Sequence, residues 1–265
     1  MAVLIRPFGL AALLLGLAVA PAFAVFGGKT VGSGDIVATT LAAVLDQTSK
    51  GAQLCTATML APRVVLTAAH CTEGGAPGLK VIFATTLVDV PSERLRNVTA
   101  VAKAEKTTDA KGSFAFNNPD DVALLVLDSP APAGTTFATL TEGNGTGAVR
   151  VAGYGATSEL RNGILGNSEV GFDKTLRAAG LSLAVKGPVL TADQSKGTGV
   201  CTGDSGGPAF TIAGNSLRIA GVLIGVSASK SASDFCRGSA HYVSIPRWRD
   251  WIVETAGKLG QPLTP

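Results

Sequence analysis

Short apolar runs separated by turn-forming residues make up most of the chain. Five of them are QLCTATML (53–60), RVVLTAAH (63–70), KVIFATT (80–86), DVALLVLD (121–128) and AVRVAGYG (148–155). Runs of this length, rich in Val, Leu, Thr and Ala and bounded by Gly, Pro, Asn and Asp, predict β-strands. Residues 208–228 predict two further strands that meet at a turn over residues 213–216. No internal repeat of fixed period is present.

Helical spacing is clear only at the end of the chain. Four apolar residues there fall on one helical face: Ile245, Trp248, Trp251 and Ile252. Gly257 or Gly260 is suited to end this helix. Many short strands with little helix favour an all-β barrel or sandwich over an α/β sheet. The Pro-, Gly- and Thr-rich segment 129–147 is predicted to be a linker.

Residues 1–24 have the features of a secretory leader. Arg6 gives a positive start, residues 10–20 form an apolar run, and Ala22-Phe23-Ala24 fits the small-x-small rule for signal peptidase. The run is shorter than the roughly 20 residues of a membrane span, which argues against an N-terminal anchor. We therefore expect cleavage after Ala24, and the alanine-rich leader favours a bacterial source.

The charge balance argues against two classes of partner. The chain has 22 Lys and Arg against 19 Asp and Glu, a net charge of +3, and no block of like charge. We expect no nucleic-acid partner, and no membrane association after the leader is removed. A chain of this length can bury a large core as one large β domain or two small ones.

The four cysteines of an exported protein indicate disulfides rather than a metal site. They are Cys55, Cys71, Cys201 and Cys236, and none forms a C-x-x-C pair. Composition alone leaves three pairings open.

The most informative segment is CTGDSGGP, residues 201–208. A serine becomes an effective nucleophile when a base takes its proton and donors stabilise the oxyanion that follows. The glycines around Ser205 allow a sharp turn and bring a substrate carbonyl close to the amides of Gly203 and Ser205. A plain Gly-rich turn is the alternative, but six such consecutive residues favour a nucleophile.

A base and a carboxylate have candidates as well. His70, one of two histidines, ends an apolar run beside Cys71, where a disulfide would fix its backbone. Asp121 directly precedes another apolar run and is the expected partner of the imidazole. Asp120 is interpreted as a solvated turn residue.

These motifs, TAAHC, DVALL and GDSGGP in that order, resemble those of the trypsin/chymotrypsin family of serine proteases. VAGYGAT is similar to the family's Gly-Trp-Gly stretch, and HYVS followed by Trp251-Ile252 is similar to its last strand and terminal helix. The resemblance covers essentially the whole mature chain. It implies an all-β fold of two six-stranded antiparallel β-barrels, residues 25–140 and 141–265, with a C-terminal α-helix and the active site between the barrels.

The resemblance also implies roles for individual residues. Ser205 would be the nucleophile, His70 the general base and then acid, and Asp121 the group that orients it. The amides of Gly203 and Ser205 would form the oxyanion hole. The implied protein is a secreted or periplasmic serine endopeptidase, a monomer without cofactor or metal. Its partners would be a protein or peptide substrate and a protein inhibitor.

Two further features follow from the same resemblance. The implied disulfides are Cys55–Cys71 and Cys201–Cys236. VFGG at residues 25–28 stands where mature family members begin with a motif like Ile-Val-Gly-Gly. In those proteins the new α-ammonium pairs with the aspartate before the nucleophile, here Asp204. Signal peptidase would then export and activate the protein in one event, without a propeptide.

The predicted specificity pocket has an uncharged base. Trypsins carry an aspartate six residues before the nucleophile, where this chain has Gly199, followed by Val200. Ala240 is expected on the opposite wall. A buried Lys or Arg would be unpaired there at a cost of several kcal/mol, so cleavage after an apolar residue, leucine or an aromatic, is expected. Asp234 or Arg237 would change this if either reached in from the preceding loop.

One departure and two rival functions accompany the resemblance. Ile224 occupies the position of a serine that supports the catalytic aspartate, unless Ser227 on a shifted strand replaces it. This keeps open a catalytically weak, protease-like binding protein. A Ser-dependent esterase is the other rival, because Ser205, Asp234 and His241 follow the chain order of α/β-hydrolases. No alternating strand and helix pattern precedes Ser205, which argues against it.

Overall fold

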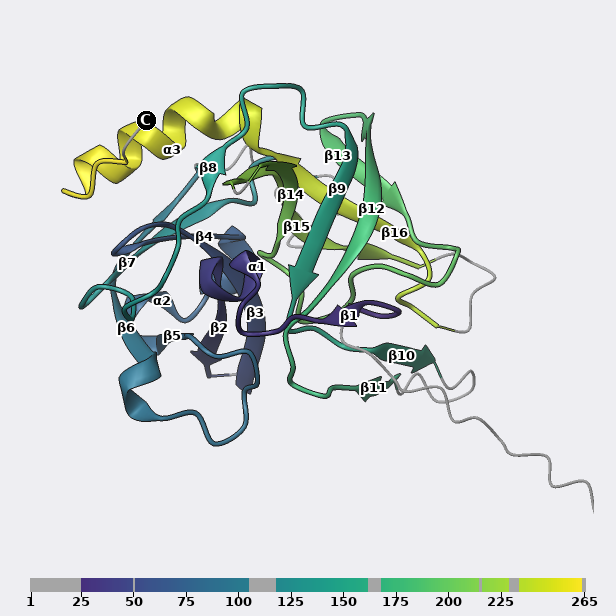
Figure 1. Ribbon diagram of the computed structural model, residues 1–265, viewed down its shortest axis with the longest axis horizontal. Coiled ribbons are helices and arrows are strands. Elements are labelled where there is room, and N and C mark those ends of the chain that lie inside the picture. Colours follow the sequence, from purple (N-terminus) through teal and green to yellow (C-terminus); the bar gives the residue numbers. More distant parts are fainter. Residues whose placement is uncertain are drawn as a thin grey trace, which may run out of the picture.

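Two six-stranded antiparallel β-barrels and a C-terminal helix form the fold (Figure 1), which confirms the predicted fold class. The computed structural model describes residues 25–49, 51–104, 118–161, 168–214, 216–228 and 234–263. The predicted leader, residues 1–24, lies outside the described residues.

The first barrel closes in the order β2-β3-β4-β7-β6-β5. Its strands are β2 (Leu41–Thr48), β3 (Gly51–Ala61), β4 (Val64–Thr67), β5 (Leu79–Ile82), β6 (Leu95–Lys103) and β7 (Ala123–Leu127). Every residue of β7 is buried, and this strand pairs with β4 and β6. The apolar runs at residues 53–60, 63–70, 80–86 and 121–128 all contribute strands to this barrel.

The second barrel closes because β9 pairs with both β12 and β14. Its strands are β9 (Gly147–Gly153), β12 (Arg177–Lys186), β13 (Val189–Asp193), β14 (Pro208–Ala213), β15 (Ser216–Ser227) and β16 (Ser239–Ser244). The predicted hairpin is confirmed: β14 pairs with β15, and Ala213 lies opposite Ser216.

Short elements connect and flank the barrels. They are β1 (Lys29–Thr30), which pairs with β12, β8 (Thr139–Leu140), which pairs in parallel with β15, and the hairpin β10 (Ser158–Arg161) and β11 (Ser168–Gly171). The short helices are α1 (Ile36–Thr40) and α2 (Gly75–Gly78), with 3₁₀ turns at Ala69–Thr72 and Ser92–Arg94. The segment predicted as a linker therefore contains a short strand.

The predicted terminal helix is confirmed as α3 (Ile245–Lys258). Its buried residues Ile245, Ile252 and Ala256 join the main hydrophobic core. Gly260, not Gly257, has the left-handed backbone that suits a helix end, with φ +70°. In the described part of the chain, no helix has the length and apolar content needed to cross a membrane.

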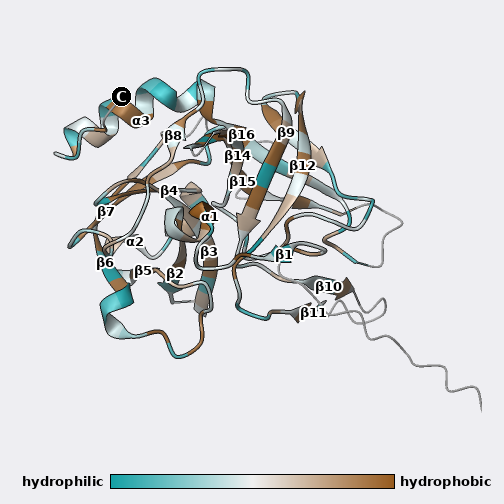
Figure 2. Cartoon of the chain, viewed as in Figure 1, coloured by the Kyte–Doolittle hydropathy of each residue, from teal (hydrophilic) through white to brown (hydrophobic). Residues whose placement is uncertain are grey.

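Apolar residues follow the barrel strands, as Figure 2 shows by hydropathy. The largest fully buried side chains include Tyr154, Tyr242 and Phe210. Two disulfides tie loops to this framework, and they are the pairs that the resemblance implies: Cys55–Cys71 and Cys201–Cys236. The first joins β3 to the turn after β4, and the second joins the segment before β14 to the segment before β16.

Candidate active site

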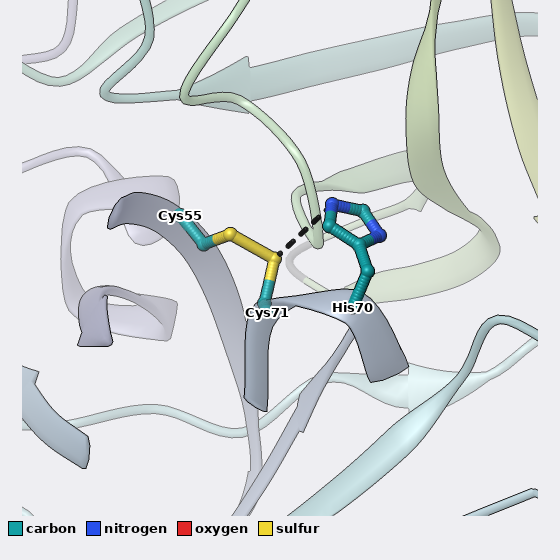
Figure 3. Close-up of side chains that lie close together, drawn as sticks. All are labelled: Cys55, His70 and Cys71. Carbon is teal, nitrogen blue, oxygen red and sulfur yellow. Dashed lines mark hydrogen bonds between the residues drawn. A yellow bond between two sulfur atoms is a disulfide. The ribbon is translucent and has the colours of Figure 1, made fainter. Parts of the chain in front are cut away.

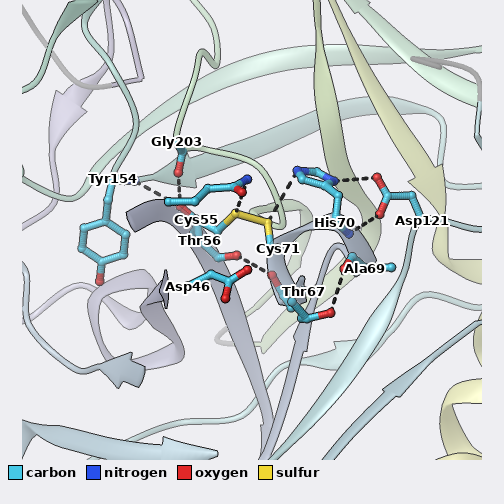
Figure 4. The surroundings of a disulfide bond; sticks show 12 residues. Asp46, Cys55, Thr56, Thr67, Ala69, His70, Cys71, Asp121, Tyr154 and Gly203 are labelled. Carbon is cyan, nitrogen blue, oxygen red and sulfur yellow. Dashed lines mark hydrogen bonds and ion pairs between the residues drawn. A yellow bond between two sulfur atoms is a disulfide. The ribbon is translucent and has the colours of Figure 1, made fainter. Parts of the chain in front are cut away.

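The end of β4 and the start of β7 bring His70 and Asp121 together. Thr67, the last residue of β4, lies opposite Ala123, the first of β7, so the residues just beyond these strand ends are neighbours. His70 Nδ1 lies 2.7 Å from Asp121 Oδ2, and the His70 backbone N–H donates to Asp121 Oδ1 at 2.9 Å (Figure 4). Both side chains are mostly buried, with 11% and 12% exposed. The carboxylate thus fixes both the imidazole and its backbone.

Ser205 and His70 line one cavity of about 460 Å³. The two barrels meet here, because the Thr56 N–H on β3 donates to the Ser205 carbonyl at 2.8 Å. The described contacts include no hydrogen bond between the Ser205 hydroxyl and His70. Such bonds are often long before substrate binds, so the shared cavity is the informative observation.

His70 also lies against the first disulfide. Its Nε2 is 3.6 Å from Cys71 Sγ (Figure 3). Ligand atoms of Cys55, His70 and Cys71 lie within 4.8 Å of one another, a cluster that could resemble a metal site. Because the two sulfurs are joined in a disulfide, neither is available as a thiolate ligand.

Glycines let the Ser205 turn pack closely against the first barrel. Gly203 has φ +92° and Gly206 φ +78°, where a side chain is strained. A Cβ at Gly206 would lie 2.1 Å from Thr67 Oγ1. Among the described residues, the N–H groups of Gly203 and Ser205 donate to no protein acceptor. Both remain available to an oxygen atom of a ligand.

Asp204, directly before Ser205, is fully buried. Its Oδ1 accepts from the Gly155 N–H at 2.7 Å, and its Oδ2 accepts from the Cys201 N–H at 2.8 Å. Burial raises the pKa of this carboxyl to about 7, and the two amide donors oppose the shift only in part. No described basic side chain contributes to holding its charge.

Residues 25 and 26 are both buried, and they pack against residues at or next to Cys201, a hydrogen-bond donor to Asp204. Val25 packs in a cluster with Val200 and Tyr242, and Phe26 packs in a second cluster with the Cys201–Cys236 disulfide. Burial, and after it the charge of Asp204, raise the pKa of Tyr242. Val25 has φ +44°, a strained backbone for a β-branched residue.

The residues predicted for the specificity pocket do not line the cavity. Gly199, Val200 and Ala240 are buried, and none of them is among its lining residues. Asp234 does not enter it either, because its Oδ1 accepts from the Glu159 and Cys236 N–H groups. The Arg237 guanidinium lies instead near Gly197.

Ile224 is buried on the cavity wall. Ser227, the candidate replacement for the missing serine, has its Oγ 2.8 Å from His241 Nε2. His241 therefore lies with Ser227 on the neighbouring strand, and burial lowers its pKa. This histidine does not line the cavity of Ser205, and the all-β fold rules out an α/β-hydrolase.

The loop that carries Asp121 is held from outside by α3, a contact that the sequence did not predict. Trp248 Nε1 donates to the Pro119 carbonyl at 2.6 Å, and Arg247 Nη2 lies 3.6 Å from Asp120 Oδ1. The interpretation of Asp120 as solvated is wrong, because only 3% of it is exposed. The helical periodicity places Trp248 on an apolar face but gives no sign of this contact.

Comparison with known proteins agrees with this arrangement. The model of the family described as Trypsin matches residues 34–252. A trypsin of Saccharopolyspora erythraea is 29% identical over 172 residues, 61% of this chain and 72% of that protein. Snake venom serine proteinase 14 of Crotalus adamanteus is 29% identical over 212 residues, 75% of this chain and 76% of that protein.

Human kallikrein-11 is 26% identical over 227 residues, 76% of this chain and 71% of that protein. With a family match that spans both barrels, the chain belongs to the trypsin family and is a serine endopeptidase.

Proposed function

We propose that the protein is an exported endopeptidase that uses Ser205, His70 and Asp121 and cleaves after uncharged, apolar residues. The observation that carries this proposal is the cavity itself. It is lined by a serine and by a histidine that is hydrogen-bonded to a buried carboxylate. The unit of residues 25–140 supplies the histidine and the carboxylate, and that of residues 141–265 supplies the serine.

In the proposed reaction, His70 Nε2 takes the hydroxyl proton of Ser205 as Oγ attacks the substrate carbonyl carbon. Asp121 holds Nδ1 and stabilises the imidazolium that forms. The new oxyanion accepts hydrogen bonds from the Gly203 and Ser205 amides. His70 then protonates the leaving amine, and a water molecule activated in the same way hydrolyses the acyl-enzyme. Loss of one oxyanion donor costs about 10²–10³ in kcat in such sites.

Exposure of Val25 is the proposed switch. Asp204 is buried with two amide donors and no described basic side chain to pair with it, and burial raises its pKa. A free α-ammonium on the buried Val25 would supply the missing cation and hold the Gly203 amide in place. Cleavage also removes the strain at Val25, because its φ angle is defined by the peptide bond that is cut. The proposed cleavage follows Ala24.

The lining of the cavity supports an uncharged side chain before the scissile bond. Its described lining residues include no Asp, Glu, Lys or Arg. Gly199 leaves the base without a carboxylate, so a buried Lys or Arg would be unpaired. The two disulfides fit an oxidising compartment and support the proposed export, whether to a periplasm or beyond the cell.

Covalent labelling by a fluorophosphonate tests this function. The wild-type exported protein is expected to react at Ser205, and Ser205→Ala is expected to lose the adduct while keeping its thermal unfolding transition. A folded wild-type protein with Val25 exposed that takes no label would instead support the inactive binding protein. Label on another serine would contradict the assignment of the nucleophile.

A further inference from the structure

Gln194, the residue after β13, is fully buried and bridges two segments of the second barrel. Its Nε2 donates to the Val200 carbonyl at 3.0 Å and to the Cys236 carbonyl at 2.8 Å. Its Oε1 accepts from the Val200 N–H at 2.6 Å. The carboxamide therefore joins the segment that leads to Ser205 to the segment before β16, and both of its N–H donors are used.

The same carboxamide explains the glycine at position 199. A Cβ at Gly199 would lie 2.1 Å from Gln194 Oε1 and 2.4 Å from its Cδ. Real Cβ atoms do not approach other atoms this closely. The three hydrogen bonds of the Gln194 amide would have to break for it to move away. A side chain at position 199 and this conformation of Gln194 are thus mutually exclusive. The carboxamide of Gln194 fills the space that a side chain at position 199 would need.

Cys201, Val226 and Phe235 line the cavity, but Gly199 and Gln194 do not. Gln194 bonds Val200 and Cys236, the chain neighbours of the lining residues Cys201 and Phe235, so the carboxamide lies directly behind this lining. A long side chain that entered between the two walls would meet a carboxamide with no free N–H to offer. Such a base suits neither a cation nor a bulky ring.

We propose that Gln194 determines specificity by forming the floor of a shallow pocket. It limits the residue before the scissile bond to small and medium apolar side chains, from alanine to leucine, and excludes phenylalanine and lysine. This inference rests on the proposed endopeptidase function of the same cavity, and it narrows the sequence-based expectation, which admitted aromatic residues.

The test is kcat/KM for peptide p-nitroanilides that differ only in the last residue: Ala, Val, Leu, Phe or Lys. In the wild-type protein, Leu is expected to exceed Phe by at least about tenfold, since misfit of a methylene or more in a pocket changes rates by about 10–200-fold. Gln194→Ala deepens the pocket and is expected to raise the Phe/Leu ratio about tenfold or more. An unchanged ratio in folded Gln194→Ala would overturn the proposal.

Gln194→Met is the matched control, because it keeps the length of the side chain but loses all three hydrogen bonds. It is expected to keep the wild-type ranking if volume sets the limit. Should Gln194→Ala fail to fold, the wild-type series decides: Phe cleaved as well as Leu overturns the proposal. Fluorophosphonate labelling distinguishes failure of the proposed endopeptidase function from failure of the proposed role of Gln194. A protein that takes no label contradicts the endopeptidase function, whereas a labelled protein without a size limit contradicts only the role of Gln194.

Discussion

The two barrels contribute unequal halves of the proposed active site. On the side of the first barrel, His70 and Asp121 already make two hydrogen bonds to each other. On the side of the second barrel, Asp204 is buried without a cation, and its pKa is raised to about 7. The buried Tyr242 hydroxyl in the same barrel has no hydrogen-bond partner among the described residues. The hydrogen bonds of the first half are already formed, and the proposed switch would bring a positive charge to the second half.

This difference supports the place that we propose for the switch. The pair on the first barrel depends on strand pairing and a disulfide, which are unaffected by events at the N-terminus. The turn that carries Ser205 depends on Asp204, which lies in the barrel that buries Val25. Processing is therefore expected to complete the oxyanion hole and to leave the His70–Asp121 pair unchanged.

The largest expected effect comes from disrupting the hydrogen bond between His70 and Asp121. Asp121→Asn is expected to lower kcat by about 10⁴, because an amide favours the wrong tautomer of His70. Stopped assays on a peptide substrate measure this loss. Asp120→Asn is the matched control, since Asp120 faces Arg247 rather than His70, and is expected to change kcat less than tenfold. Similar losses in both variants would contradict the assignment of Asp121.

The second prediction concerns the proposed ion pair between the Val25 α-ammonium and Asp204. Insertion of one glycine between Ala24 and Val25 leaves a secretory cleavage site but moves the ammonium away from Asp204. Activity on a peptide substrate is expected to fall by at least about 10²–10³, the effect of losing an oxyanion donor.

Asp204→Asn is the comparison for this insertion, because it removes the other member of the same ion pair. The combined variant is expected to be no worse than the more impaired single variant, as for residues that act together. Full activity of the insertion variant, with its extra glycine verified, would refute the switch.

The third prediction concerns the stability of the unprocessed chain. Folded Asp204 keeps its proton up to about pH 7, against a usual pKa of 3.8, so the native state binds more protons than the unfolded state between these values. The free energy of unfolding is therefore expected to fall as pH rises from about 4 to 7, by on the order of 4 kcal/mol. Urea unfolding in a Ser205→Ala background measures it.

Processing should remove this dependence, because an ammonium beside Asp204 stabilises the charged carboxylate at neutral pH. Asp204→Asn in the unprocessed chain is expected to remove the Asp204 contribution to the slope as well. A decline of equal size in the unprocessed Asp204→Asn chain would show that another group causes it.

The smallest effect is expected where Trp248 of α3 contacts the loop that carries Asp121. Trp248→Phe removes the hydrogen bond to the Pro119 carbonyl and is expected to cost about 1 kcal/mol of stability. If the bond positions Asp121, the acid limb of the kcat–pH profile moves as well. Trp251→Phe is the control, because Trp251 packs edge to face with Trp248 at 5.7 Å but makes no described hydrogen bond. An unchanged pH profile in Trp248→Phe would leave it only a structural role.

The elements that could be predicted from the sequence are those with a local signal. Strand β7 and the β14–β15 hairpin follow from apolar runs and a turn, and α3 follows from spacing on one face. Contacts between distant segments carry no such signal. The burial of Asp120 depends on a helix more than 120 residues later in the chain.

The role of Gln194 escaped prediction for the same reason. It lies in an ordinary polar stretch, and its proposed role depends on the approach of Val200 and Cys236, which are distant from each other in the chain. In the sequence, Gly199 indicates that the pocket has no carboxylate at this position. It does not indicate that the Gln194 side chain, from another segment, fills the space beside it. Motif spacing identifies the residues around the cavity, whereas tertiary packing sets the cavity's depth.

Intact mass spectrometry and peptide mapping of the exported protein after fluorophosphonate treatment test the central claim most directly. This measurement reads the first residue and the modified residue in the same molecule. The account predicts a chain that begins at Val25 and carries the adduct on Ser205. Labelled protein that begins at any other residue, or protein that begins at Val25 and carries no adduct, would contradict it.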